Sequence, residues 1–486
     1  MNTHDRAVEG IDNLELLSNS ELQLAFNRVK AAYNTKGAFS FSERKEKLKK
    51  MAILLDENRN AIINALSAYF GHRAIEETRI SEIANTVANI DYAVSHLHKW
   101  MRPKLRSTSM WFLPGQNRVM PQALGVVGVM VPWNYPVNLA ISPLAAALAA
   151  GNRCLIKVSE LTPKTEVILR TILAQVFDDS EVVVVGGDAT VAAEFASLPF
   201  DHLLFTGSTA IGKKVMSAAA HNLTPVTLEL GGKNPVVIEE DYFLGEACHR
   251  ILWGKTYNAG QTCAAPDYAL IPKGAINDFR VWSSRHYRSL FPCGAMSMDY
   301  TSIINQSHFN RLQDLVDDAR NKGAEILQLE DFTDQHRKHR KFPFTLIFNP
   351  SLDSKVMKEE IFGPILPIIE VNGLDEAIQF VNERSRPLAI YHFTDSTESK
   401  NKLAEKVVAG GMTVNDVMLQ YLQPSQPFGG VGGSGFGAYH GEEGFKTFSH
   451  MKAIFSQRGF GSFTGIKLLY PPYGMLGRLI IKLMRG

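Results

Sequence analysis

The chain has 486 residues, of which 45% are hydrophobic and 21% are charged, and its formal net charge is +2. This length allows two or three domains with substantial cores, and the composition excludes extensive disorder. A net charge so close to zero gives no sign of a nucleic-acid-binding surface, so we expect no nucleic-acid partner.

The cysteines and the apolar segments indicate where the protein resides. The four cysteines contain no Cys-x-x-Cys pair, so they predict neither a zinc site nor a disulfide framework. The N-terminus is polar and lacks the apolar core of a signal peptide. The longest apolar run, Val137 to Ala150, is interrupted by Pro143 and too short to span a bilayer, which predicts a buried helix. We therefore expect a cytoplasmic enzyme with no metal centre and no integral membrane span.

The chain from Ser20 to about Trp100 has the apolar spacing of helices. Ser20 and Gln23 form a capping-box pattern at its start. A second helix is predicted over residues 42–58, with an apolar side formed by Leu48, Met51, Ile53 and Leu55. Around residues 101–121, prolines and a glycine separate short strand-like pieces, which predicts a hairpin or arm.

Strands and helices alternate from Gly125 to Leu230. Buried strands are predicted at 126–131, 154–158, 182–185, 202–205 and 226–229, and Thr162-Pro163 opens one of the intervening helices. Repeated βα units of this length predict a doubly wound parallel sheet. Such sheets bind nucleotides at the carboxyl ends of their strands.

The turn after the strand at 202–205 is a candidate phosphate-binding element. It runs from Thr206 to Gly212 and leads into a helix predicted over 213–219. Glycines let the backbone approach a phosphate, and a helix N-terminus offers free N–H groups. The spacing from Gly207 to Gly212 is neither G-x-G-x-x-G nor a P-loop, so a tight turn without a ligand remains equally compatible.

A second alternating region runs from Gly231 to about Val414, with a strand at 268–271 and a helix at 307–322. Within it, Cys263 lies among small residues between Gly260 and Pro266. A thiol in such a turn can meet a substrate, but alone it is weak evidence for a nucleophile. The Gly-rich stretch 427–437 is predicted to be a loop.

Glu229 ends the apolar strand at 226–229, immediately before a pair of glycines. An uncompensated carboxylate in such a place is costly. The residue is therefore either an ion-paired structural group or a functional one.

Six motifs together resemble the aldehyde dehydrogenase superfamily over nearly the whole chain. They are Pro132-Trp133-Asn134-Tyr135-Pro136, Gly151-Asn152 leading to Lys157-Val158-Ser159-Glu160, Phe205-Thr206-Gly207-Ser208, Leu228-Glu229-Leu230-Gly231-Gly232-Lys233, Gly260-Gln261-Thr262-Cys263 and Glu360-Ile361-Phe362-Gly363-Pro364. Three further segments resemble the class 3 branch, and bacterial coniferyl aldehyde dehydrogenases in particular: Cys263 to Tyr268, Arg386 to Tyr391 and Gly437 to Gly441.

The resemblance implies an α/β aldehyde dehydrogenase fold with a Rossmann-like NAD-binding domain, an α/β catalytic domain and a β-arm for oligomerisation. The implied boundaries are 1–105 and 123–230 for the NAD-binding domain, 231–414 for the catalytic domain, 106–122 and 443–460 for the arm, and 461–486 for the C-terminal tail. Because the class 3 branch is typically dimeric, we expect a homodimer. The short basic apolar piece 475–485 is expected to dock on the protein's own surface, although its cations would also suit a membrane surface.

The resemblance also assigns the chemistry. The thiolate of Cys263 would attack an aldehyde to form a thiohemiacetal, with its oxyanion stabilised by the Asn134 amide and the Cys263 backbone N–H. Loss of hydride leaves a thioester, and Glu229 would activate the water that hydrolyses it to a carboxylic acid. Tyr135 and Trp253 would line the aldehyde entrance or be ordinary core aromatics. An aromatic funnel would suit aryl or cinnamyl aldehydes such as coniferyl aldehyde, or medium-chain aliphatic ones.

The implied cofactor-binding residues are Trp133, Lys157, Glu160, Gly207, Ser208, Gly212, Glu360 and Phe362. Lys157 and Glu160 would bond the adenine ribose, and Glu360 the nicotinamide ribose. Because the Glu160 carboxylate would repel a 2′-phosphate, NAD is favoured, although NADP is also used in this branch. Val158 departs from the family pattern, which commonly has proline there.

Two alternatives differ in chemistry. A coenzyme A-acylating semialdehyde dehydrogenase would replace hydrolysis by thiolysis, but such relatives generally lack the base that Glu229 supplies. A non-catalytic binding protein on the same scaffold would be free to lose Cys263 or Glu229, and both are present.

Overall fold

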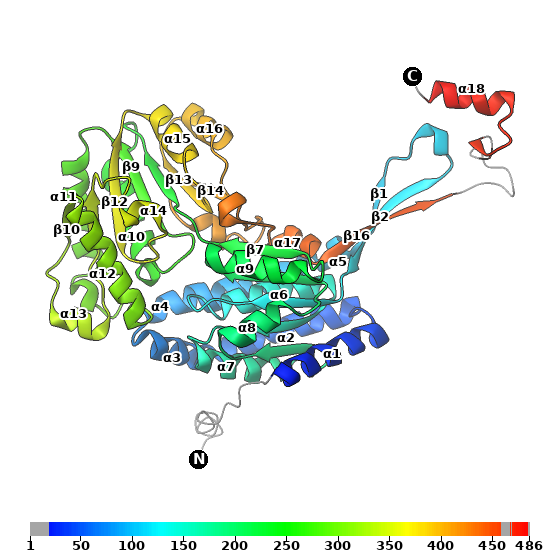
Figure 1. The fold of residues 1–486 in the computed structure, drawn as a ribbon, viewed down its shortest axis with the longest axis horizontal. Coiled ribbons are helices and arrows are strands. Elements are labelled where there is room, and N and C mark those ends of the chain that lie inside the picture. Colours follow the sequence, from blue (N-terminus) through cyan, green and yellow to red (C-terminus); the bar gives the residue numbers. More distant parts are fainter. Residues whose placement is uncertain (1–18, 458–466, 468, 485–486) are drawn as a thin grey trace, which may run out of the picture.

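The computed structural model describes residues 19–457, 467 and 469–484. Two β-sheets with their covering helices form the body of the molecule, and a narrow three-stranded arm projects from it (Figure 1). The α/β architecture with a projecting β-arm that the sequence leads us to expect is the one observed.

Helices precede the first sheet, as expected: α1 (Asn19–Lys36), α2 (Phe41–Glu57), α3 (Arg59–Phe70), α4 (Ile75–Thr78), the π-helical turn η3 (Arg79–Ala84) and α5 (Asn85–Met101). Because α1 already includes Ser20, the predicted cap at that residue is wrong. A capping box instead starts α2, where Ser40 and Glu43 bond each other's backbone N–H groups. Ile53 is 57% exposed, so it does not belong to the buried side of α2.

The first sheet has the order β15-β7-β6-β3-β4-β5. Its strands are β3 (Val126–Met130), β4 (Arg153–Lys157), β5 (Val182–Val185), β6 (His202–Gly207), β7 (Val226–Leu230) and β15 (Gly435–Phe436). The first five run parallel, which confirms the doubly wound sheet. Between them lie α6 (Asn138–Ala150), α7 (Pro163–Leu173), α8 (Ala189–Ala196) and α9 (Thr209–Ala220).

Three local expectations in this sheet needed correction or refinement. Helix α6 continues through Pro143 and is buried along its whole length. Helix α9 begins at Thr209 rather than at residue 213, because Ser208 caps it by accepting the Ile211 N–H, so Gly212 lies inside the helix. The stretch 427–437 is not wholly a loop, since β15 pairs antiparallel with β7 and places Gly435 opposite Glu229.

The second sheet has the order β10-β11-β12-β9-β8-β13-β14 and is parallel except for the β10–β11 pair. Its strands are β8 (Pro235–Ile238), β9 (Tyr268–Pro272), β10 (Glu325–Gln328), β11 (Thr345–Phe348), β12 (Ile365–Val371), β13 (Ala389–Phe393) and β14 (Gly411–Val414). The helices of this region are α10 (Leu244–Thr256), α11 (Ile276–Leu290), α12 (Gln306–Asn321), α13 (Asp334–His339), α14 (Lys355–Lys358), α15 (Leu374–Asn382) and α16 (Thr397–Lys406). Short 3₁₀ turns are η5 (Tyr257–Gly260), η6 (Gly294–Met296), η7 (Leu419–Leu422) and η8 (Gly432–Ser434).

The arm is an antiparallel sheet of β1 (Lys104–Arg106), β2 (Gln116–Ala123) and β16 (Ser449–Ser456), with the 3₁₀ turn η4 (Met110–Phe112) between β1 and β2. Helix α17 (Gly441–Thr447) leads into β16. The predicted hairpin is thus present, and the C-terminal part of the chain adds its third strand. Leu105, Met110 and Leu113 on the arm are exposed.

Helix α18 (Met475–Leu483) lies away from the two sheets (Figure 1). Its apolar side chains are exposed, among them Met475, Leu476, Leu479 and Leu483. The expected docking of this helix on the protein's own surface is therefore wrong. Within residues 19–457, 467 and 469–484, we find no helix of the length and apolarity needed to span a membrane.

Candidate active site

Cys263 follows a strained turn between α10 and β9. Asn258 and Ala259 both have φ of 50°, and Gly260 has φ of 71°. A Cβ on Gly260 would lie 2.4 Å from the Gly363 carbonyl oxygen, so the turn requires glycine at this position. The Gln261 amide donates to the Asn258 carbonyl at 2.9 Å and so braces the turn. Strain held by its surroundings in this way is concentrated at functional sites.

An apolar cavity reaches the Cys263 thiol. Its lining residues are Ile80, Ser81, Tyr135, Leu139, Trp253, Tyr257, Thr262, Cys263, Ala264, Met418, Tyr421 and Leu422. The structure therefore brings Tyr135 and Trp253 to the same cavity as Cys263. The Tyr135 hydroxyl lies 2.6 Å from Thr262 Oγ1, and Ser81 Oγ lies 2.7 Å from the Tyr257 hydroxyl. Since these hydroxyls are paired within the wall, the cavity presents mainly hydrocarbon to its contents.

Asn134 lies at the Cys263 turn. It is 3% exposed, and its side-chain Nδ2 donates to the Gln261 carbonyl at 3.1 Å. A carboxamide nitrogen carries two N–H groups, so this contact leaves one for a ligand oxygen. The two residues, far apart in the sequence, thus share one site.

The Glu229 carboxylate on β7 is buried without a hydrogen bond or an ion pair among the described residues. It is 3% exposed, and neither carboxylate oxygen has a hydrogen-bond partner among the described residues. Burial raises the pKa of this carboxyl well above its usual range. Because no ion pair accounts for it within the described chain, Glu229 is a functional candidate rather than a structural one.

The Cys263 thiol is protonated near neutral pH when no ligand is present. Burial raises the pKa of this thiol to about 12, and the carboxylates of Glu360 and Glu229 add to the shift. The charges of both carboxylates thus act on the sulfur. Ionising this thiol requires a base or a bound cation.

The residues predicted for the nicotinamide end adjoin this turn. The rings of Trp133 and Phe362 are 5.5 Å apart in an edge-to-face arrangement, and Phe362 has φ of 49°. The pKa of Glu360 is raised to about 8, first by its removal from solvent and then by Asp267, while the Gly232 N–H opposes the shift. The structure thus brings Trp133, Glu360 and Phe362 together near Cys263.

The residues predicted for the adenine end lie at the carboxyl end of β4, where Lys157 is the last residue of the strand and Glu160 follows it. Lys157 Nζ donates to the carbonyls of Val158 and Gly187, at 2.6 and 2.7 Å. Burial lowers the pKa of Lys157, and the carboxylates of Glu160, Glu166 and Asp188 oppose that shift. The Val158 N–H donates to the Val185 carbonyl at 3.0 Å, a bond that the family's usual proline cannot make.

The turn from Gly207 to Ser208 ends β6 and starts α9, so the free N–H groups of that helix face the edge where strands β3 to β7 end. Gly212 lies one turn further on, inside α9. This arrangement offers backbone donors to an anion at the sheet edge.

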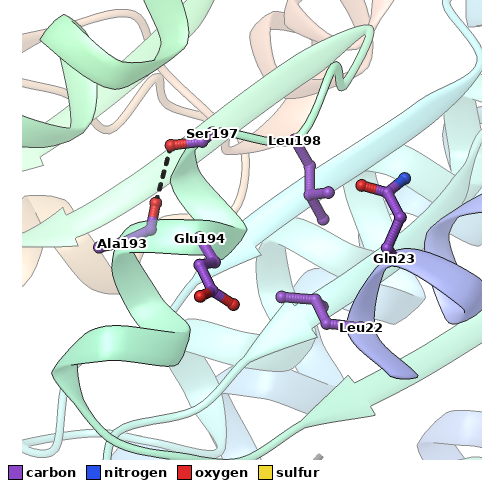
Figure 2. A pocket seen from close by; sticks show the side chains of 6 residues that line it. All are labelled: Leu22, Gln23, Ala193, Glu194, Ser197 and Leu198. Atoms are coloured by element: carbon purple, nitrogen blue, oxygen red, sulfur yellow. Dashed lines mark hydrogen bonds between the residues drawn. The ribbon is translucent and has the colours of Figure 1, made fainter. Parts of the chain in front are cut away.

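A second hollow lies between α1 and α8 (Figure 2). It is lined by Leu22, Gln23, Ala193, Glu194, Ser197 and Leu198, and Ser197 Oγ donates to the Ala193 carbonyl at 3.0 Å. It shares no lining residue with the Cys263 cavity and brings no set of catalytic groups together.

Sequence reasoning missed much of the cavity wall. Ile80 and Ser81 come from η3, Leu139 from α6, and Tyr421 and Leu422 from η7. None of these residues belongs to a recognisable motif. Only the folding of these three distant segments around Cys263 reveals them.

The chain is similar to known proteins over nearly its whole length. A family model described as "Aldehyde dehydrogenase family" matches residues 5–454. A probable coniferyl aldehyde dehydrogenase from Pseudomonas aeruginosa is 44% identical over 465 residues, which cover 96% of this chain and 96% of the relative. A dimeric NADP-preferring aldehyde dehydrogenase from Mus musculus is 37% identical over 455 residues, covering 93% of this chain and 98% of the relative.

Solved structures show the same similarity. A substrate-bound Staphylococcus aureus AldH superposes with a TM-score of 0.89 at 34% identity, covering 95% of this chain and 99% of the other. PnpE in complex with nicotinamide adenine dinucleotide superposes with a TM-score of 0.82 at 26% identity, covering 90% of each chain.

Proposed function

The chain belongs to the aldehyde dehydrogenase family. We propose that Cys263, Asn134 and Glu229 carry out its reaction and that its substrates are aldehydes with apolar side groups. The protein is an NAD(P)-dependent aldehyde dehydrogenase. The observation that carries the proposal concerns the cysteine that lines the apolar cavity: an oxyanion donor lies at its turn, and an unpaired buried carboxyl acts on its thiol.

The first steps follow from this arrangement. Cys263 attacks the aldehyde carbon as a thiolate, and the negative charge moves to the carbonyl oxygen. The second N–H of the Asn134 amide and the Cys263 backbone N–H stabilise that oxygen. Because the cavity is lined mainly by apolar groups, these donors act more strongly there than they would in solvent.

The carboxyl of Glu229 serves the second half of the reaction. After the hydride has left, Cys263 carries a thioester that water must cleave. Glu229 accepts a proton from that water, and the strong proton affinity that burial gives its carboxyl supports this role. The same residue supports hydrolysis over transfer to coenzyme A.

The residues present fit a dinucleotide. The free N–H groups at the start of α9 suit its pyrophosphate, and Trp133, Glu360 and Phe362 adjoin the place where the nicotinamide must lie to be near Cys263. When bound, the dinucleotide would accept the hydride, and the positive charge of its oxidised nicotinamide ring would favour the thiolate.

We favour NAD over NADP within this proposal. Three carboxylates, Glu160, Glu166 and Asp188, act on Lys157 at the adenine end. They would repel a 2′-phosphate there. Because the mouse relative is named as NADP-preferring, the test must compare both cofactors.

The substrate class follows from the cavity wall. Its aromatic and aliphatic lining supports aryl and cinnamyl aldehydes, including coniferyl aldehyde, and medium-chain aliphatic ones. The name of the Pseudomonas aeruginosa relative supports the cinnamyl class. We propose further that the enzyme is a cytoplasmic homodimer, with an NAD-binding and a catalytic domain divided near residue 230.

Steady-state rates with a panel of aryl, cinnamyl and aliphatic aldehydes, followed by the absorbance of reduced NAD and NADP, test the substrate and the cofactor. Equal rates across the panel would remove the cinnamyl preference. Oxidation of none of them would contradict the proposed function itself.

Variants test the residue roles. We expect Cys263→Ala to abolish oxidation, and Glu229→Gln to release one equivalent of reduced cofactor per site and then stall as the thioester. Cys293→Ala is the matched control, because Cys293 is exposed and lies outside the cavity. Oxidation at the normal rate by Cys263→Ala would reject the mechanism.

A further inference from the structure

A buried ion pair holds the segment that carries Asn134. The side chains of Arg73 and Glu82 are both 0% exposed, and Arg73 Nη1 lies 3.1 Å from Glu82 Oε1. The same Nη1 donates to the Asn134 carbonyl at 2.9 Å, while Asn258 Nδ2 is farther from that oxygen, at 3.5 Å. Arg73 therefore ties the backbone of Asn134 to the carboxylate of Glu82.

Glu82 fixes the other end of the same segment. Its Oε2 accepts the N–H of Val137 at 3.1 Å and that of Asn138 at 2.8 Å. These N–H groups lie at the start of α6, where helical backbone donors have no partner within the helix and a carboxylate is favoured. The pair thus clamps residues 134–138 at both ends.

Stability alone does not account for this pair. Burying two charges costs hydration, and a buried ion pair is often no more stable than apolar residues of the same volume. Arg73 Nε and Nη2 have no hydrogen-bond partner among the described residues. The guanidinium instead lies over the rings of Phe70 and Tyr135, 5.0 and 4.9 Å from their centroids. The pair instead fixes the position of the Asn134 backbone and packs against a wall of the substrate cavity.

The element that carries Glu82 is also unusual. Glu82 lies in η3, a π-helical turn, and π-helical turns occur frequently at functional sites. The same turn supplies Ile80 and Ser81 to the cavity. The turn therefore contributes both to the wall around the substrate and to the support of Asn134.

We propose that Arg73 and Glu82 are positioning residues that aim the Asn134 amide at the aldehyde oxygen without touching substrate themselves. The inference rests on the oxyanion role proposed above for Asn134. Removing an oxyanion donor lowers kcat by roughly 10²–10³-fold, and a displacement of about 1 Å can cost roughly 10²-fold. If the Asn134 side chain is no longer held in place, it should therefore lose a large part of its contribution to kcat.

The test is a double-mutant cycle. Arg73→Met combined with Glu82→Gln removes both charges and leaves no isolated buried ion. We expect kcat for aldehyde oxidation to fall at least roughly tenfold with little change in KM for NAD. Adding Asn134→Ala should cause no further loss beyond that of Asn134→Ala alone, because both changes disable the same donor.

The neighbouring exposed pair provides a matched control. Arg79 and Glu76 form an ion pair at 2.7 Å in the same stretch of chain, with side chains 50% and 67% exposed. Arg79→Met combined with Glu76→Gln should retain wild-type kcat. If the buried double variant does not fold, Glu82→Gln alone carries the same cycle, because it preserves size and an acceptor oxygen.

Three outcomes would overturn the inference. Wild-type kcat in the folded Arg73 and Glu82 variant, or losses that multiply with that of Asn134→Ala, would show that the pair does not act through Asn134. Wild-type kcat in Asn134→Ala itself would instead reject the oxyanion role and the inference together, which separates the two failures.

Discussion

Glu229 and Cys263 illustrate how burial prepares single residues for chemistry. Both have pKa values raised by their removal from solvent, and the charge of Glu229 contributes to the shift at Cys263. The thiol of Cys263 therefore favours its protonated form near neutral pH until a ligand changes the local charge. We expect thiol alkylation of the unliganded enzyme to be slow at neutral pH for this reason.

His202 provides a pH-dependent test of the core. It is 6% exposed, and burial lowers its pKa from 6.5 to about 4. Because the folded state holds the neutral form, the stability linked to this residue is fully present above pH 6.5 and is lost as the pH falls towards 4. The unfolded chain binds the proton first, and the shift corresponds to about 3 kcal/mol.

In the His202→Gln variant, the glutamine still offers Thr227 a polar partner but does not titrate. We expect this variant to lack the pH-dependent part of the stability that His202 provides. The difference in free energy of unfolding between wild type and variant should shrink by about 3 kcal/mol from pH 7 to pH 4. Urea denaturation at one fixed protein concentration measures it. A difference independent of pH would contradict the neutral buried state.

At the scale of elements, β15 shows how a Gly-rich stretch supports the site. Gly435 has φ of 118°, and a Cβ there would lie 1.8 Å from the Leu228 carbonyl oxygen. The close approach is what lets β15 pair with β7 beside Glu229. Larger side chains are excluded by both conformation and space.

Gly435→Ala should therefore break the β15–β7 pairing. We expect it to lower the free energy of unfolding by about 1–3 kcal/mol and kcat with it, since the strand bearing Glu229 loses its neighbour. Thermal unfolding and steady-state rates measure the two effects. Gly433→Ala is the control, because its Cβ would make only an ordinary contact with Ser385, 3.4 Å away; equal effects of the two changes would disprove the argument.

At the scale of the whole molecule, the arm exposes apolar side chains that a single chain does not cover. Leu105 is 67% exposed, Met110 72% and Leu113 56%. An exposed set of this kind on a projecting sheet is typical of an interaction surface. The homodimer expected from the family resemblance remains a prediction that this arm supports.

Light scattering after size-exclusion chromatography tests it. Wild type should have twice the 53.9 kDa mass of one chain, and Leu105→Glu should shift the population towards one chain. Leu223→Glu is the control, because Leu223 is 89% exposed on the body rather than on the arm. A wild-type mass of one chain would reject the dimer.

Sequence alone determined the fold class, the five parallel strands of the first sheet and the chemical candidates. Buried parallel strands appear as unbroken apolar runs, and the motifs around Asn134, Glu229 and Cys263 are contiguous in the chain, so neither needs tertiary information to be recognised. Element starts such as that of α9 and the short strand β15 were misjudged, because capping bonds and single strand pairings depend on partners outside the local window.

Tertiary structure alone decided what surrounds those candidates. The cavity wall and the Arg73–Glu82 clamp join segments with no common motif, and the exposure of α18 reverses what its composition led us to expect. Burial is a property of the packed molecule, not of a residue type. The raised pKa values of Cys263 and Glu229, and the absence of a described partner for Glu229, could therefore be learned only once the two sheets were in place.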